Sequence, residues 1–107
     1  MKSPFKKTTI VIHHSLVSYD KNADQFDAIN RYHKSKGWGR IGYNYTLNKK
    51  GIIKIGRLDN EITAAAREKM MNYRGIHICV EGNFDHELPT EEQILQLKIY
   101  QLLEFYQ

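Results

Sequence analysis

Two short β-branched runs, far apart in the chain, most constrain what this sequence can fold into. Residues 8–13 and residues 75–80 are rich in β-branched side chains, and each run has the length of a strand rather than of a helix. In the second run three aliphatic side chains alternate with His77 and Cys79, so these two share the other face of the strand. Segments with helical periodicity lie between and after the runs. The sequence therefore predicts an α/β domain with a mixed central β-sheet flanked by helices.

The segment between the two runs predicts one helix and one hairpin. Residues 20–36 carry apolar and aromatic side chains at helical spacing and end at Gly37, as an amphipathic helix would. Residues 41–48 and 52–56 predict two strands, and the Asn-Lys-Lys-Gly sequence at 48–51 is a good turn between them.

The last third of the chain is helical by pattern, with one ambiguous stretch before it. Residues 64–71 could form a short helix. Thr90 and Gln93 have the spacing of a capping box, which predicts the start of the last helix. The predicted buried face of that helix is formed by Leu95, Ile99, Leu102, Leu103 and Tyr106. Further apolar residues lie outside this face, so we expect an exposed patch that leads to dimerisation or aggregation.

Composition excludes several classes of protein. At 107 residues, with 41% hydrophobic and 26% charged residues, the chain is a single ordered domain. No apolar run approaches the roughly 20 residues of a membrane helix, and no long apolar segment follows the basic N-terminus, which predicts a protein that is cytoplasmic when synthesised. The single cysteine excludes an internal disulfide. The net charge of +4 comes from scattered lysines, which favours a solvated surface over a nucleic-acid interface.

Histidines and tyrosines form the candidate chemical groups. His13 and His14 end the first strand, where an α/β sheet usually presents its ligands. A second cluster follows the first helix: His33, Trp38, Tyr43, Asn44 and Tyr45. An imidazole at a strand end is a typical zinc ligand, and a nearby phenol can stabilise an oxyanion. By themselves these residues favour a different interpretation, a core or surface pair of histidines and core aromatics.

Three blocks of sequence taken together are more specific. They are IVIHHS at residues 10–15, GWGRIGYNY at residues 37–45 and GIHICVEGNF at residues 75–84. In this order and spacing they closely resemble the type-2 amidase family, which includes phage lysozyme-type N-acetylmuramoyl-L-alanine amidases and animal peptidoglycan recognition proteins. The resemblance runs over about residues 8–105, and it implies that family's fold.

The resemblance also implies a chemistry. The family holds one Zn²⁺ with two histidines and a cysteine or an acid, and cleaves the amide between N-acetylmuramic acid and L-alanine of peptidoglycan. By position, His13 resembles the first zinc ligand, and Tyr43 resembles the tyrosine that contacts substrate and oxyanion. His33 and Asn44 resemble groove residues that bind the muramyl peptide.

The zinc site implied by the resemblance is incomplete in this chain. The family's second histidine and its ligand cysteine lie beyond the last helix, so we expect residues 1–107 to be a C-terminally truncated domain, about the N-terminal two-thirds of the fold. Cys79 is not that cysteine. His77 and Cys79 could join His13 as substitute ligands, since they share one strand face, but a buried cysteine beside an edge histidine is the favoured interpretation.

Two functional hypotheses follow. The first is a zinc amidase of peptidoglycan, inactive as an isolated chain, that binds zinc weakly or not at all and acts on the cell wall if released. The second is a degenerate module that binds peptidoglycan or a protein without hydrolysis. The expected partner is a muramyl peptide, with a homodimer through the C-terminal helix, and neither nucleic acid nor membrane.

Overall fold

The computed structural model describes residues 1–17 and 24–105, with side chains described up to residue 99. Four strands and three helices follow one another as β1 (Thr9–His14), α1 (Phe26–Ser35), β2 (Tyr45–Leu47), β3 (Ile53–Ile55), α2 (Lys69–Arg74), β4 (Gly75–Val80) and α3 (Glu91–Phe105). Within these residues no helix has the length and apolar character that crossing a bilayer requires.

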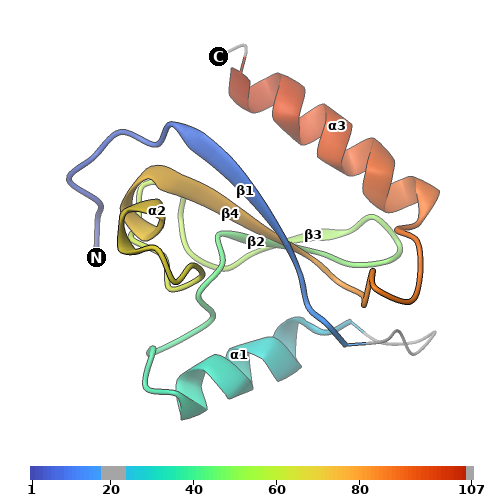
Figure 1. Ribbon diagram of the computed structural model, residues 1–107, viewed down its shortest axis with the longest axis horizontal. Coiled ribbons are helices and arrows are strands. Elements are labelled where there is room, and N and C mark those ends of the chain that lie inside the picture. The colour runs from blue at the N-terminus through green and yellow to red at the C-terminus, as the bar shows by residue number, and fades with distance from the viewer. Residues whose placement is uncertain (18–23, 106–107) are drawn as a thin grey trace.

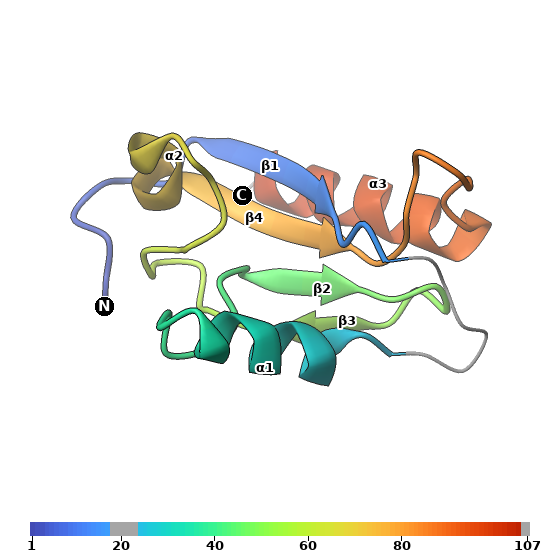
Figure 2. The same ribbon diagram turned by 60° about the horizontal axis from the view of Figure 1, so that its bottom comes forward.

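The strands form one mixed sheet in the order β1-β4-β2-β3 (Figure 1). β4 pairs in parallel with both β1 and β2, and β3 pairs with β2 as an antiparallel hairpin. The turn of this hairpin ends at Gly51, whose φ of 82° favours glycine. Figure 2 shows α3 behind the sheet and α1 in front of it. The predicted mixed sheet with flanking helices is therefore confirmed, as are the strands predicted at residues 8–13 and 75–80, which form neighbouring strands of this sheet.

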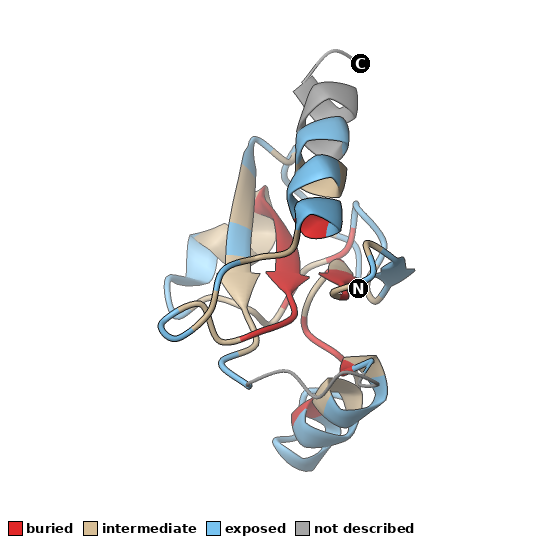
Figure 3. Cartoon of the chain, turned by 90° about the vertical axis from the view of Figure 1, so that its right-hand side faces the viewer, coloured by how far each residue is buried: buried red, intermediate tan, exposed pale blue. Residues whose placement is uncertain are grey.

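β4 is the core of the domain, because all six of its residues are buried (Figure 3). Its aliphatic face joins Leu47, Ile78 and Val80 in a cluster that Leu97 of α3 covers. Its other face carries His77 and Cys79, as the alternation predicted. β1 lies at one edge of the described sheet, and Ile12 there is 47% exposed.

α3 begins as predicted but buries a different face. Thr90 N–H donates to Oε1 of Gln93 at 3.0 Å, and Gln93 N–H donates to Oγ1 of Thr90 at 3.2 Å, which is the predicted capping box. The amide of Gln93 also donates to two backbone carbonyls at the end of the sheet. Because Gln93 points inward, Leu97 one turn later does so too.

The prediction that Leu95 and Ile99 are buried on α3 is therefore wrong: they are 57% and 42% exposed. Two residues beyond an inward-facing position, a helix presents its opposite side. Leu102, Leu103 and Tyr106 lie outside the described side chains. Of the apolar residues outside the predicted buried face, Ile94 is exposed but Leu97 packs on the core, and dimerisation through this helix stays a prediction.

Two other boundaries differ from the sequence prediction. α1 begins at Phe26, and residues 18–23 lie outside the described part. The ambiguous alanine stretch is not helical. Oδ1 of Asn72 accepts the N–H groups of Ala65 and Ala66, and its Nδ2 donates to the carbonyl of Ala66. α2 begins only at Lys69, after Glu68 caps it.

Candidate functional site

A pair of imidazoles lies on the polar face of the sheet. His13 at the end of β1 is opposite Cys79, and Val11 is opposite His77, so all four side chains share one face. Nε2 of His13 lies 2.7 Å from Nδ1 of His77, and the ring centroids are 5.0 Å apart. Nε2 of His77 in turn lies 2.7 Å from the backbone carbonyl of Met71 in α2. The sheet thus joins the predicted His13 to a second, buried histidine.

Tyr43 lies next to this pair. Its ring centroid is 5.3 Å from that of His13 and 5.4 Å from that of His33. Its phenol and the thiol of Cys79 lie close enough for each to shift the pKa of the other. The structure therefore brings together three of the four side chains that the sequence selected, His13, His33 and Tyr43.

Burial keeps the groups of this cluster uncharged. It lowers the pKa of His13 to about 4, with the neighbouring His77 and His14 as smaller causes, and it lowers the pKa of His77 as well. Burial also raises the pKa of the Tyr43 phenol far above its usual value and that of the Cys79 thiol to about 12. At neutral pH the phenol and the thiol therefore both carry their protons.

His33 fixes the loop that carries Tyr43. His33 is buried in the last turn of α1, and its Nδ1 accepts the N–H of Gly42 at 2.8 Å. Its ring meets Trp38 edge to face, with centroids 4.7 Å apart. The last turn of α1 and the loop after it are thereby held beside Tyr43.

Asn44 has a different place from the other selected residues. Its side chain is 0% exposed. Oδ1 accepts the N–H of His77 at 2.7 Å, and Nδ2 donates to the carbonyls of Arg57 and Leu58. Its side chain thus binds three backbone groups of the protein. Asn44 therefore lies beneath the surface and is not exposed to solvent or to a pocket.

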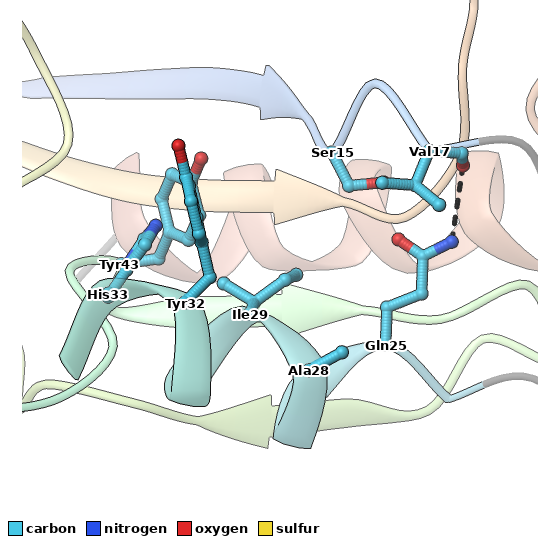
Figure 4. A pocket seen from close by; sticks show the side chains of 8 residues that line it. All are labelled: Ser15, Val17, Gln25, Ala28, Ile29, Tyr32, His33 and Tyr43. Atoms are coloured by element: carbon cyan, nitrogen blue, oxygen red, sulfur yellow. Dashed lines mark hydrogen bonds between the residues drawn. The ribbon is translucent and has the colours of Figure 1, made fainter. Parts of the chain in front are cut away.

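A pocket of about 380 Å³ lies between α1 and the end of β1, which is a size that accepts a small ligand (Figure 4). It is lined by Ser15, Val17, Gln25, Ala28, Ile29, Tyr32, His33 and Tyr43. Figure 4 shows His33, Tyr43 and Tyr32 at one end and Ser15, Val17 and Gln25 at the other, where the Gln25 amide donates to the carbonyl of Val17. The pocket adjoins the imidazole pair through Tyr43.

The sequence interpretation missed most of this lining, although a signal for it was present. Ile29, Tyr32 and His33 recur at helical spacing, and with Phe26 they were assigned to the apolar face of an amphipathic helix. In the structure Ile29, Tyr32 and His33 line the pocket, and Tyr32 is exposed. An apolar helical face predicts contact, but it does not distinguish contact with a core from contact with a ligand.

A second pocket of about 440 Å³ lies beyond Trp38. Lys36 and Arg67 line it, with Asn72 and the three alanines of residues 64–66. The ammonium of Lys36 lies 5.1 Å from the ring centroids of both Tyr32 and Trp38, so it links this basic pocket to the first one.

The described residues do not make a zinc site by themselves. No group of three His, Cys, Asp or Glu side chains among them is placed to share a metal ion, whereas zinc sites in proteins use three or four protein ligands. His77 and Cys79 were the substitutes considered from the sequence. His77 is instead hydrogen-bonded to His13 and Met71, and Cys79 lies near Tyr43. His13 is left as a single candidate ligand.

Comparison with known proteins gives a consistent result. The family described as N-acetylmuramoyl-L-alanine amidase (Amidase_2) matches residues 4–102. The endolysin of Enterobacteria phage T3 is 27% identical over 86 residues, which are 74% of this chain and 56% of the endolysin. The chain thus spans a little over half the length of that relative.

Solved structures agree on the fold. The N-acetylmuramoyl-L-alanine amidase LysC from Clostridium intestinale superposes with a TM-score of 0.77 at 32% identity, over 95% of this chain and 66% of LysC. A variant of Drosophila PGRP-LB in complex with tracheal cytotoxin superposes with a TM-score of 0.81 at 23% identity, over 96% of this chain and 63% of that protein. At 23% identity, the similarity to PGRP-LB shows a shared fold and nothing further.

Proposed function

The chain belongs to the N-acetylmuramoyl-L-alanine amidase family, and from that premise we propose that it is a peptidoglycan-directed amidase domain that binds a muramyl peptide in the pocket beside α1. The observation that carries this proposal is that His33 and Tyr43 line one end of that pocket while His13 lies next to Tyr43 outside the lining. The ring centroids of His13 and His33 are 5.3 and 5.4 Å from that of Tyr43. The complex of a PGRP-LB variant with tracheal cytotoxin supports a ligand of this kind on this fold.

Tyr43 is the residue that we assign to the reacting carbonyl. Its phenol keeps its proton, because burial raises its pKa far above neutrality. A neutral phenol at the end of a pocket can donate a hydrogen bond to a substrate carbonyl, and that bond strengthens as negative charge develops on the oxygen. His33 lines the same wall, and Lys36 and Arg67 next to it would attract the carboxylates of a stem peptide.

Asn44 has an indirect role in this proposal. It would support ligand binding by holding the residue after Tyr43 against β4, since its own amide is bonded to His77, Arg57 and Leu58.

Zinc would find one ligand in the described residues, His13, and the further ligands would have to come from elsewhere. Metal affinity depends on ligand number and geometry. We therefore expect purified, untagged chain to contain well under one zinc per molecule by elemental analysis, and to hydrolyse no peptidoglycan alone. Stoichiometric zinc that is lost in Cys79→Ser would contradict this expectation and would favour the substitute site on β4.

Ligand binding by the pocket is the direct test of the proposed function. We expect the chain to bind a soluble muramyl peptide, and Tyr32→Ala to weaken binding about tenfold, which is about 1.4 kcal/mol, because this exposed phenol forms one wall of the pocket. Isothermal titration calorimetry gives both affinities.

Asp27→Ala is the matched control for that test. Asp27 is exposed on the same helix and does not line the pocket, so its replacement should leave the affinity unchanged. Equal affinities for wild type and Tyr32→Ala would remove the pocket from the proposal. Binding without release of a stem peptide is expected of the chain alone under both hypotheses, whereas release would exclude the second, a module that binds peptidoglycan and does not hydrolyse it.

A further inference from the structure

We propose that His77 is a positioning residue that holds His13 in one tautomer, protonated at Nε2 and with a free lone pair on Nδ1. The inference deepens the proposed function and rests on it for its meaning, since His13 is the residue to which that function assigns a metal. It concerns a side chain that the sequence interpretation treated as an edge histidine without a role.

The hydrogen-bond directions follow from the groups themselves. The carbonyl of Met71 can only accept, so Nε2 of His77, 2.7 Å away, must carry the proton that it donates. A neutral imidazole with a proton on Nε2 has a bare Nδ1. That bare nitrogen lies 2.7 Å from Nε2 of His13, which must therefore be the donor. The remaining nitrogen of neutral His13, Nδ1, is left with its lone pair.

The opposite direction would need a charged histidine in the core. If Nδ1 of His77 donated to His13, His77 would carry protons on both nitrogens, because Met71 still requires one on Nε2. His77 is 0% exposed, and no acid is among the groups that shift its pKa, whereas the positive charge of Lys7 disfavours protonation further. An unpaired charge at such a position is costly, so the neutral arrangement is favoured.

The backbone around His77 keeps its ring in place. Its N–H is bound by the fully buried Asn44. A Cβ at Gly75 would lie 2.7 Å from both Nε2 of His77 and the carbonyl oxygen of Met71. The hydrogen bond between these two atoms therefore needs a glycine at position 75. Met71 lies in α2, and its carbonyl also accepts the backbone N–H of Gly75, the residue at which the helix ends.

A fixed tautomer has a consequence for His13. Histidines that bind a metal commonly donate their other ring N–H to a fixed acceptor, which sets the tautomer and the ring orientation. Here the acceptor is another imidazole, anchored in turn by a carbonyl. The three groups form one line of hydrogen bonds from α2 across β4 to β1, and this line selects Nδ1 of His13 as the nitrogen that is offered to a ligand.

Nitrogen NMR of the ¹⁵N-labelled chain tests the inference without any metal. At neutral pH, long-range proton–nitrogen correlations should show His13 and His77 both protonated at Nε2 and bare at Nδ1. His13 protonated at Nδ1, or averaging between its two tautomers, would overturn the proposal. This spectrum needs no variant, so the test stands even if replacing His77 prevents folding.

Variants then separate His77 from its neighbours. In His77→Phe the acceptor is lost, and His13 should become a mixture of tautomers. Gly75→Ala keeps both imidazoles but should have the same effect, because the added methyl group separates the His77 ring from the Met71 carbonyl. His14→Phe is the control: His14 stacks on Phe84 and accepts its N–H, apart from the pair, so the His13 signals should keep the wild-type tautomer.

Added Zn²⁺ distinguishes failure of this inference from failure of the proposed function. Zinc should shift Nδ1 of His13 in the wild-type spectrum, with an apparent affinity about 10-fold or more above that of His77→Phe. Zinc bound at Nε2 of His13 would overturn the positioning role. A fixed Nε2–H tautomer that zinc leaves unperturbed would support the role of His77 and agree with weak zinc binding by the isolated chain. The same tautomer in a chain that binds no muramyl peptide would support the role of His77 while the proposed function failed.

Discussion

Replacing Gly42 with alanine is expected to abolish cooperative folding or to lower the free energy of unfolding by more than about 3 kcal/mol. A Cβ at this position would lie 2.8 Å from the carbonyl carbon of Ala64, and closer still to its oxygen, which no real Cβ contact allows. The opposing atoms are backbone, and Gly42 is itself bonded there, since its carbonyl accepts the N–H of Ala64 at 3.1 Å. Chemical denaturation followed by circular dichroism measures the loss.

Gly39→Ala in the same loop is the matched control. A Cβ at Gly39 would meet nothing within 4 Å, but its φ of 81° lies in the left-handed region. The cost there is backbone strain alone, about 1 kcal/mol. Equal losses of stability in the two variants would show that close packing against Ala64 is not the reason why position 42 needs glycine.

The two variants matter for function because Gly42 precedes Tyr43. The N–H of Gly42 is bound by His33 on one side and its carbonyl by Ala64 on the other. These two hydrogen bonds fix the backbone of the loop between α1 and the alanine segment, and with it the position of the Tyr43 Cα. The phenol then reaches Cys79 on β4. The position of Tyr43 is thus set by close approach of backbone, which only glycine permits here.

The sequence predicted those features of the fold that depend on local pattern. Alternation in residues 75–80 predicted both the strand and the face shared by His77 and Cys79, because side-chain direction along a strand follows a period of two. The capping box of Thr90 and Gln93 was predicted because its two hydrogen bonds are local. The family blocks placed His13 and Tyr43 in one site, and in the structure their rings are neighbours.

What the pattern could not predict depends on contacts between distant residues. Leu95 was expected in the core, but the inward face of α3 is set by Gln93, whose amide reaches carbonyls at positions 47 and 81. The alanine stretch looked helical, but Asn72 binds its backbone from outside. His77 was given no role, because its bond to His13 exists only once β4 lies beside β1. Each of these signals arises from tertiary structure.

Replacing Asn44 with alanine is expected to lower the free energy of unfolding by about 3 kcal/mol or more. The variant leaves the N–H of His77 and the carbonyls of Arg57 and Leu58 without their partner in a fully buried place. Each buried polar group left unsatisfied costs about 1–3 kcal/mol. Thermal and urea unfolding measure this, and Asn60→Ala, at an exposed position, should stay within about 0.5 kcal/mol of wild type.

An isosteric variant separates the hydrogen bonds from the volume of the side chain. Asn44→Asp keeps the acceptor for His77 but turns the donor toward Arg57 and Leu58 into a second acceptor, so it should also be strongly destabilising, without any cavity. If Asn44→Ala instead melted like wild type and bound a muramyl peptide more weakly, Asn44 would belong in the groove and not beneath it. The loss of stability is the expected result, because the side chain of Asn44 binds three backbone groups and is fully buried, out of reach of a ligand.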